Sequence, residues 1–492
     1  MLPQIAMRPN ILWYCTDQQR FDTIGGLGNS DIHTPNLDRF LERSTAFTRA
    51  YCQSPICTPS RASFLTGEYP SAMGINQNGN PHFPAHYAER LVPHRLAKAG
   101  YDCGLIGKLH IASAAGGQEP RVDDGYSYFQ YSHDHKGPDA TGHDYAQWLR
   151  DQGADAASIM GAAVTGDTYK DEKTRTDLFG LKEPAPETDN IPASLHQTHW
   201  CTEKAIEFID RERPADQPWM LSINPFDPHP PFDPPWEYYR RYDPAQMQGP
   251  HLIESDLDHQ RSITEAGVDF QSQPRRIGTD EGRRIQAAYY AMIEQIDLEF
   301  GRILDHLDHT GQTENTMVIF TSDHGEALGD HGLLLKGCRF YEGSVRVPLI
   351  ISWPGASRGA VSPTLVELTD LAPTIYEAAG LPIPYWVQGR SLAPVLSGEV
   401  NHHRDSVRCE FLGGIAFPDQ THATMYRDER WKLVTYHGKN RAELFDLDSD
   451  PWEHHDLSQD CAHAEVLADL QRRSFDATVG AHPPDNPRTE PY

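Results

Sequence analysis

The stretch "TMVIFTSDHGE" (Thr316–Glu326) changes abruptly from apolar residues to residues that bind metals and protons. Its first five residues are typical of a buried strand, and the next six contain two carboxylates and a histidine. A long amphipathic segment, 282–311, precedes it and predicts a helix. A long helix that leads into a short apolar strand is typical of βα units in a mostly parallel sheet.

The same alternation continues on both sides of this stretch. We expect further strands at 10–15, 103–107, 218–224 and 345–355, and helices at 33–43, 88–101, 197–213 and 368–380. The predicted fold class is therefore α/β, with a large, mostly parallel sheet sandwiched by helices in residues 1–384. Residues 385–492 predict a small α+β domain, with short antiparallel strands in 422–437 and 442–457 followed by a terminal helix. Residues 111–190 have weak periodicity and predict long surface loops or a lid insertion.

Composition limits the partners of the chain. It has 492 residues and a formal net charge of −27, which argues against nucleic acid or an anionic membrane as a partner. This net charge is compatible with a locally positive pocket that binds a small anion. The sequence contains no apolar run of about twenty residues, so it predicts no membrane span. The eight cysteines show no spaced framework and the N-terminus lacks the pattern of a signal peptide, so we expect reduced thiols and a cytoplasmic location.

Polar side chains follow four of the expected strands. They are Asp17 and Gln18; Lys108 and His110; Asp227 and His229; and Asp323, His324 and Lys336. Taken singly, each aspartate would be an ordinary helix cap and each lysine an ordinary surface residue. Because the carboxyl ends of parallel strands meet at one edge of a sheet, four such endings together indicate a functional site. Asp17, Gln18, Asp323 and His324 would suit one divalent cation.

A second short stretch, "CTPSRASFLTG" (Cys57–Gly67), places a cysteine and an arginine at the start of a predicted helix. Its C-x-P-S-R pattern resembles the signature of the type I, formylglycine-dependent sulfatases of the alkaline phosphatase-like superfamily. The segments "TDQQ", "GKLH", "PHPPF", "TSDHGE", "HTPNLDRF" and "ELFDLDSDPWEHHDL" resemble other motifs of that family. The resemblance covers nearly the whole chain except 111–190 and 241–280.

The resemblance implies a chemistry that the residues alone do not show. Cys57 would be oxidised by a formylglycine-generating maturase to 3-oxoalanine (formylglycine), whose hydrate would be both a metal ligand and the nucleophile that attacks sulfur. His229 would protonate the leaving alcohol, and His110 would remove the proton from the second hydroxyl so that sulfate is expelled. Lys108 and Lys336 would bind the sulfate oxygens. Arg61 would hold residue 57 and the carboxylates.

Two features keep the substrate and the metal open. Gln18 and His324 replace residues common in many sulfatases and also resemble choline-sulfatase-like enzymes and phosphonate monoester hydrolases. The resemblance to sulfatases implies calcium. Manganese is the alternative, because the imidazole of His324 is a better ligand for manganese than for calcium. Lys108 and His110 favour a sulfatase of aryl or small alkyl sulfate esters over a phosphonate monoester or phosphodiester hydrolase. A non-catalytic binding protein would have lost site residues, and none is lost here. Exposed strands in the C-terminal domain would support a homo-oligomer.

Overall fold

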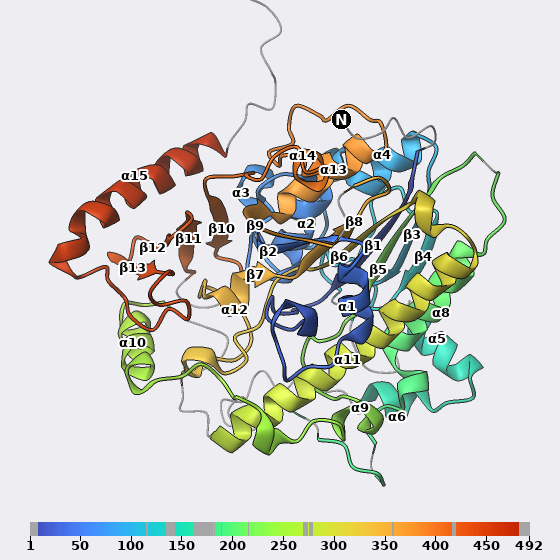
Figure 1. The fold of residues 1–492 in the computed structure, drawn as a ribbon, viewed down its shortest axis with the longest axis horizontal. Helices are drawn as coiled ribbons and strands as arrows, with labels where there is room; N and C mark the ends of the chain where they lie inside the picture. The colour runs from blue at the N-terminus through green and yellow to red at the C-terminus, as the bar shows by residue number, and fades with distance from the viewer. Residues whose placement is uncertain are drawn as a thin grey trace, which may run out of the picture.

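The computed structural model describes residues 8–481 apart from 115–116, 134–142, 162–180, 182, 188, 215, 269–273, 275–278, 357–358 and 416–419. A twisted sheet runs through the middle of the molecule, with helices on both faces, and a smaller sheet lies at one side (Figure 1). This arrangement confirms the predicted α/β fold.

The large sheet has nine strands, and five successive strands from one edge are parallel. In spatial order these five are β4 (Tyr128–Tyr131), β3 (Asp102–Gly107), β5 (Trp219–Asn224), β1 (Asn10–Thr16) and β6 (Thr316–Ser322). The antiparallel β8 (Leu349–Ser352) joins β6 to β2 (Thr45–Tyr51), which also pairs with β7 (Arg346–Val347) and, in parallel, with β9 (Ala360–Glu367). The four strands whose polar endings indicated a site, β3, β5, β1 and β6, are thus direct neighbours.

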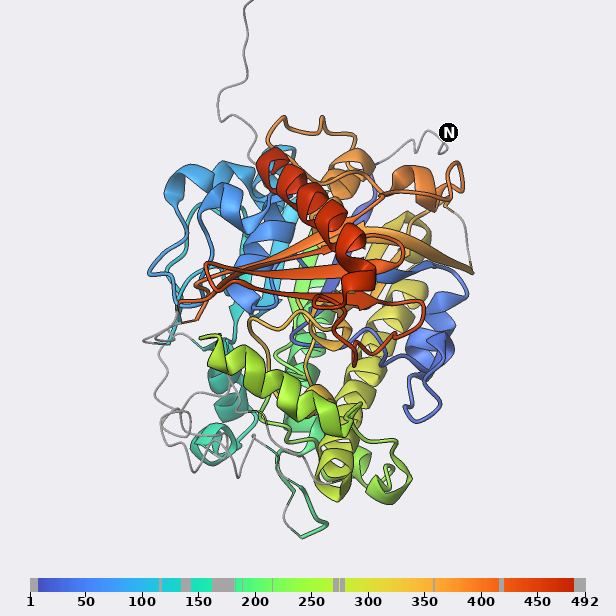
Figure 2. The same ribbon diagram turned by 90° about the vertical axis from the view of Figure 1, so that its left-hand side faces the viewer.

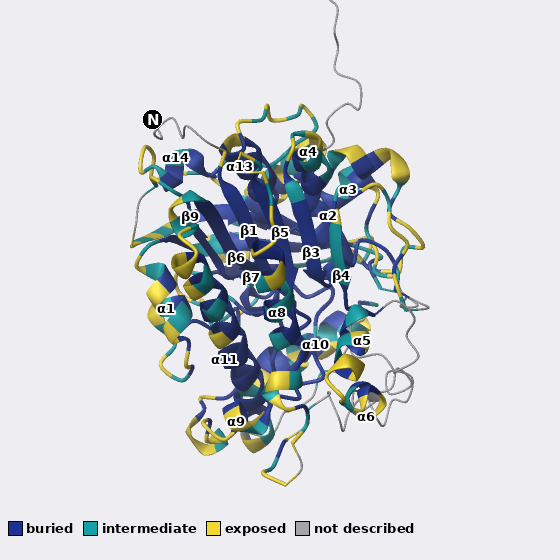
Figure 3. Cartoon of the chain, turned by 90° about the vertical axis from the view of Figure 1, so that its right-hand side faces the viewer, coloured by how far each residue is buried: buried dark blue, intermediate teal, exposed yellow. Residues whose placement is uncertain are grey.

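Side chains of β1 alternate between two apolar clusters, one on each face of the sheet. Ile11 and Trp13 pack in the cluster formed with α2, α4 and α13, whereas Leu12 and Tyr14 pack in the cluster formed with α1, α8 and α11. Strands β1, β5 and β6 are buried on both faces, which explains why they read as continuous apolar runs (Figure 3).

The helices of the described residues follow the predicted pattern, with several short additional turns. Their bounds are α1 (Pro35–Leu41), α2 (Cys57–Thr66), α3 (Pro70–Met73), α4 (Val92–Lys98), α5 (Asp144–Asp151), α6 (Ala156–Gly161), α8 (Gln197–Ile209), α9 (Trp236–Tyr239), α10 (Glu254–Glu265), α11 (Thr279–His309), α12 (Glu342–Val345), α13 (Leu371–Ala378), α14 (Ala393–Leu396) and α15 (Ala464–Gly480). None of the helices in these described ranges is long and apolar enough to cross a membrane.

The C-terminal region forms an antiparallel sheet of four strands with α15 packed across it (Figure 2). Its strands are β10 (Val407–Leu412), β11 (His422–Arg427), β12 (Trp431–His437) and β13 (Arg441–Asp446). One face of this sheet, including Val407, Met425 and Val434, belongs to the same apolar cluster as α2 and the large sheet. The predicted domain boundary at 384/385 stays a prediction.

The structure corrects the sequence interpretation in three places. The segment 111–190 is not only loops, because it supplies the edge strand β4 and the amphipathic helix α5; residues 134–142 and 162–180 of the predicted lid lie outside the described residues. The single strand expected over 345–355 is split at Pro348, which cannot donate to a strand ladder. Strands β2, β9 and β10 were not predicted.

Candidate active site

Helix α2 carries Cys57 as its first residue and is buried along its whole length. The helix ends at Gly67, whose φ of 79° is the left-handed conformation that glycine adopts without strain. Backbone N–H groups at a helix N-terminus give the first turn a positive potential. The fold therefore holds the Cys57 side chain rigidly, at a helix end that favours negative charge.

Cations surround the Cys57 sulfur. Its Sγ atom lies 3.0 Å from Lys336 Nζ, 3.2 Å from His324 Nε2 and 3.7 Å from Lys108 Nζ. Burial and the nearby Asp17 raise the pKa of this thiol, but Lys108, Lys336 and His324 outweigh them and lower it to about 7. Position 57 is thus an electropositive point that favours an anionic side chain or a bound anion.

Arg61 lies one helical turn after Cys57 and joins the carboxylates of two strand ends. Its Nε donates to Asp323 Oδ2 at 2.8 Å, and its Nη2 lies 3.2 Å from Asp17 Oδ2. Its Nη1 donates to the backbone oxygen of Lys108 at 2.9 Å, while the Lys108 ammonium forms an ion pair with Asp17. Burial raises the pKa of Asp17, but Lys108, His229 and Arg61 hold it well below its usual range, so Asp17 is ionised.

Four ligand atoms converge beside this arginine. Those of Asp17, Cys57, Asp323 and His324 all lie within 4.8 Å of one another, and we name this group the strand-end cluster. The Nδ1 atom of His324 lies 2.9 Å from the backbone oxygen of Gly325, which leaves Nε2 free to face the cluster. Two carboxylates and an imidazole are donors that fit a divalent cation, so the residues agree with the predicted metal site.

Gln18 occupies the same corner in a strained backbone conformation. Its φ is 69°, and its N–H donates to Asp323 Oδ1 at 3.0 Å. The side-chain oxygen accepts from Lys336 Nζ at 2.6 Å, and the side-chain nitrogen bonds the buried Glu326. The amide oxygen of Gln18 therefore lies toward Lys336, and the role of Gln18 as a metal ligand stays a prediction.

His229 lies in a proline-rich loop after β5. Its Nδ1 is 2.7 Å from the backbone oxygen of Pro230, and its ring packs on Phe226 with ring centroids 4.5 Å apart. Burial and Lys336 lower the pKa of His229 well below its usual value, so the imidazole is neutral at neutral pH. His229 is also one of the groups that lower the pKa of Asp17.

His110 follows β3 and is also held in the left-handed region, with φ at 53°. Its N–H donates to Glu119 Oε1 at 2.9 Å, and its ring meets His133 edge to face with ring centroids 4.4 Å apart. Burial and Lys108 lower the pKa of His110 well below its usual value. A neutral imidazole is able to accept a proton, as the role predicted for His110 requires.

Several residues that support the site were not predicted as members of it. Glu326 bonds Gln18, Asn224 donates to the backbone oxygen of Lys108 at 2.8 Å, and Ser60 donates to the backbone oxygen of Asp323 at 2.5 Å. Glu119 holds the backbone of His110, and burial raises its own pKa to about 8. Glu326 and Ser60 had a signal in the sequence, through their places in the "TSDHGE" stretch and the C-x-P-S-R pattern.

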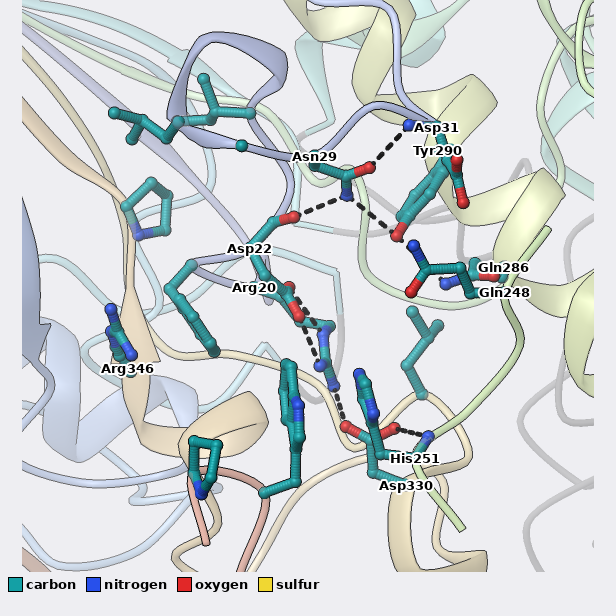
Figure 4. Close-up of a pocket in the computed structure, with 18 of the residues that line it drawn as sticks. Arg20, Asp22, Asn29, Asp31, Gln248, His251, Gln286, Tyr290, Asp330 and Arg346 are labelled. Carbon is teal, nitrogen blue, oxygen red and sulfur yellow. Dashed lines mark hydrogen bonds and ion pairs between the residues drawn. The ribbon is translucent and has the colours of Figure 1, made fainter. Parts of the chain in front are cut away.

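A separate cavity of about 440 Å³ lies behind the loop that follows β1 (Figure 4). Arg20 forms part of its wall and is held by ion pairs with Asp22 and Asp330. The ring of His251 stacks on Trp452 with ring centroids 3.4 Å apart. None of the predicted site residues is among those lining this cavity, so it is distinct from the strand-end cluster.

Comparison with known proteins decides the family. The family described as "Sulfatase" matches residues 9–381. The chain belongs to the sulfatase family. The family described as "N-sulphoglucosamine sulphohydrolase, C-terminal" matches residues 329–478 of this sulfatase-family chain. Membership of this family confirms the predicted enzyme class, a sulfuric ester hydrolase.

Two curated relatives are similar over most of their length. An arylsulfatase of Clostridium perfringens is 30% identical over 456 residues, which cover 91% of this chain and 89% of the relative. A choline-sulfatase of Rhizobium meliloti is 29% identical over 465 residues, which cover 92% of this chain and 83% of the relative. The crystal structure of the phosphonate monoester hydrolase of Agrobacterium radiobacter superposes with a TM-score of 0.77 at 24% identity, covering 96% of each chain, and shows the shared fold.

Proposed function

We propose that this enzyme hydrolyses sulfate monoesters of aryl or small alkyl alcohols to the alcohol and sulfate. One observation carries the proposal: position 57 is flanked by Lys336 at 3.0 Å, Lys108 at 3.7 Å and the ligand atoms of the strand-end cluster. An ester placed there meets two ammonium groups and, when the cation is bound, a third positive centre. Such centres stabilise the charge that develops on the equatorial oxygens during substitution at sulfur.

The number of cationic centres favours sulfate over phosphonate. A sulfate monoester has three terminal oxygens, one for each of Lys108, Lys336 and the cation. A phosphonate monoester has two terminal oxygens and a carbon substituent, so one cationic centre would face carbon and remain unpaired. Leaving a buried charge without its partner is costly, which gives a physical basis for selectivity.

We assign the steps to residues as follows. Water adds to the aldehyde of residue 57 to give its hydrate. One hydroxyl of the hydrate loses its proton to solvent and attacks sulfur, and the ester S–O bond breaks while His229 gives its proton to the departing alcohol. His110 then takes the proton of the second hydroxyl on residue 57, the bond from its carbon to the sulfate oxygen breaks, and the aldehyde re-forms as sulfate leaves. Arg61 keeps Asp17 and Asp323 in place throughout.

The neutral state of His229 places a requirement on its role as an acid. Because Lys336 and burial disfavour the imidazolium in the free site, His229 gains its proton only when the anionic ester is bound and offsets the positive charge. A bound cation held by Asp17, Gln18, Asp323 and His324 would supply positive charge that favours an ionised oxygen on residue 57. We propose calcium for this site, with manganese as the alternative because His324 is a nitrogen ligand.

The second candidate is a phosphonate monoester or phosphodiester hydrolase. The observation that favours it is the presence of Gln18 after Asp17 and of His324 after Asp323, which resembles both choline-sulfatase-like enzymes and phosphonate monoester hydrolases. In both candidates residue 57 is the nucleophile, so loss of activity on removing it does not separate them.

Relative turnover of two substrates separates the candidates. Enzyme co-expressed with a maturase should hydrolyse p-nitrophenyl sulfate with a higher kcat/KM than the phosphonate monoester p-nitrophenyl phenylphosphonate. The Cys57→Ala variant should be inactive on both. A preference for the phosphonate would reverse the assignment. The tryptic peptide that contains residue 57 should show the mass of the aldehyde, and a fully active preparation with only cysteine there would overturn the mechanism.

The predicted maturase, homo-oligomer and cytoplasmic location stay predictions.

A further inference from the structure

A second group of metal-ligating side chains lies outside the candidate active site. Among the described residues, ligand atoms of Asp256, His331 and His454 all lie within 4.8 Å of one another. Asp256 is in the first turn of α10, His331 is in a short 3-10 turn (Asp330–Gly332), and His454 is in the loop after β13. We name this group the loop cluster.

The spacing of the loop cluster fits a tetrahedral metal. Asp256 Oδ1 lies 3.5 Å from His331 Nδ1 and 3.1 Å from His454 Nδ1. Zinc bonds to nitrogen and oxygen of about 2.0–2.2 Å place two tetrahedral ligand atoms roughly 3.3–3.5 Å apart. The 3.5 Å contact is long for an N–H···O hydrogen bond, but it is a normal distance between two ligands of one ion.

The ligands are oriented by contacts of their own. The second oxygen of Asp256, Oδ2, accepts from the Ile253 N–H at 2.9 Å and also lies 3.0 Å from His454 Nδ1, so both carboxylate oxygens face His454 while Oδ1 faces His331. The His331 ring stacks on Tyr341, with ring centroids 3.7 Å apart and planes 17° apart. Hydrogen bonds and packing behind the ligands are what metal sites use to fix ligand geometry.

Backbone strain occurs at one of the two histidines and at the residue before the other. His331 has φ of 54°, and the residue before His454, Glu453, has φ of 62°. Glu453 is kept in place by Lys432 Nζ at 2.7 Å and by the Glu342 N–H at 2.7 Å. A non-glycine residue in this region costs free energy and persists where the surroundings require it.

No ammonium or guanidinium group neutralises Asp256 in the described part of the chain, where its ion-pair partners are the two histidines alone. Asp256 and His331 are buried, and 15% of the His454 side chain is exposed, which gives an ion a route from solvent. A buried carboxylate that faces two imidazole nitrogens is a donor set for a borderline cation such as zinc.

We propose that Asp256, His331 and His454 bind one zinc-type divalent cation, with water as the fourth ligand. The ion bridges three parts of the chain: the loop between His324 and Lys336, helix α10, and the loop that follows the C-terminal strand β13. Helix α10 and the C-terminal sheet lie side by side (Figure 2). The adjacent Asp330 and His251 line the cavity of Figure 4 and are joined by a 2.8 Å hydrogen bond. The ion is a clamp between elements distant in sequence, separate from the catalytic cation.

Cobalt titration tests the clamp without interference from the Cys57 thiol. Full-length Cys57→Ala protein is stripped with a chelator and titrated with Co²⁺, a visible probe of tetrahedral nitrogen and oxygen sites. Two equivalents should bind, one with tetrahedral absorption. The substitution His454→Gln, made in the Cys57→Ala protein, should remove that equivalent and its absorption. The substitution His455→Gln, at the neighbouring exposed histidine of the same protein, should leave both unchanged.

Each other outcome overturns the proposal. A single equivalent that His454→Gln retains, or an unchanged count and spectrum in His454→Gln, means that the three side chains only hydrogen-bond to one another. Zn²⁺ should also raise the Tm of Cys57→Ala and His455→Gln proteins, but that of His454→Gln by less. If His454→Gln lowers the Tm equally with and without Zn²⁺, the loop cluster binds no ion. Asp256→Asn gives the same readouts should His454→Gln not fold.

Discussion

The strand-end cluster and the loop cluster both bring carboxylate and imidazole together, but they differ in their surroundings. Asp17 and Asp323 in the first are paired with Arg61 and lie beside two lysines, whereas Asp256 in the second faces only histidines. Fixed positive charge around a site prepares it for an anion. Its absence leaves the charge of the cation itself to neutralise the carboxylate. The comparison therefore separates a site for chemistry on an anion from a site for holding the fold together.

The largest effect should come from the position that only the strand-end cluster has, the nucleophile. Cys57→Ala should lower kcat for p-nitrophenyl sulfate by about 10⁴-fold or more, because no other group can form the covalent intermediate. Steady-state kinetics measures it, with the exposed Cys461→Ala as control. Substantial turnover by Cys57→Ala would show that residue 57 is not the nucleophile. The strand-end cluster would then not differ from the loop cluster in this respect.

The next effect concerns the lysines. Lys336→Met should lower kcat/KM by about 10²–10³-fold, since it removes a charge-stabilising donor 3.0 Å from position 57. The exposed Lys98→Met should retain the activity of the parent protein. An equal loss in both variants would show that general charge, rather than a positioned ammonium, attracts the substrate.

A smaller effect, on stability, should come from the loop cluster. Asp256→Asn should lower the free energy of unfolding by about 1–3 kcal/mol even without metal, because hydrogen bonds to a charged group are lost. Urea denaturation in chelator measures it. Asp258→Asn lies in the same helix but is 74% exposed and should change stability little. If both variants are equally stable, the loop cluster does not hold α10 in place.

The smallest effect is a dependence on pH near the loop cluster. Burial lowers the pKa of His259, but its 2.7 Å ion pair with Glu443 outweighs burial and raises the pKa above 6.5. The stabilisation is therefore complete below pH 6.5 and declines as the pH rises through the raised pKa. The urea midpoint should show this decline, worth less than about 1 kcal/mol, in the parent and in His455→Gln. A decline that persists in His259→Gln would have another origin.

The two clusters also differ in what could be predicted from sequence. Asp17, Lys108, His229 and Asp323 each follow a buried apolar strand, and strand order places such endings together whatever the loops do. Asp256, His331 and His454 lie on a helix start and two loops, with no periodic pattern that relates them. Their meeting depends on how the C-terminal sheet packs against α10, which is a tertiary contact that a local pattern does not contain.

Misses in the fold have similar causes. β4 was missed because "YFQY" is short and lies, partly exposed, at the sheet edge. β9 begins with alternating exposed residues and becomes buried only from Thr364 onward, so its apolar signal is short. Glu119 gave no signal because it acts on the backbone of His110, and a backbone contact leaves no pattern of residue types. Apolar runs buried on both faces, such as β1 and β6, were predicted correctly.

The apolar cluster that α2 shares with the C-terminal sheet has a consequence in time. Cys57 leaves the ribosome 350 residues before Val407, the first strand residue of the sheet that completes this cluster. At about 5–20 residues per second, synthesis of that length takes roughly 20–70 s. During this interval the apolar cluster to which α2 contributes is incomplete. The length of chain that follows Cys57 thus sets how long helix α2 waits for the sheet that completes its packing.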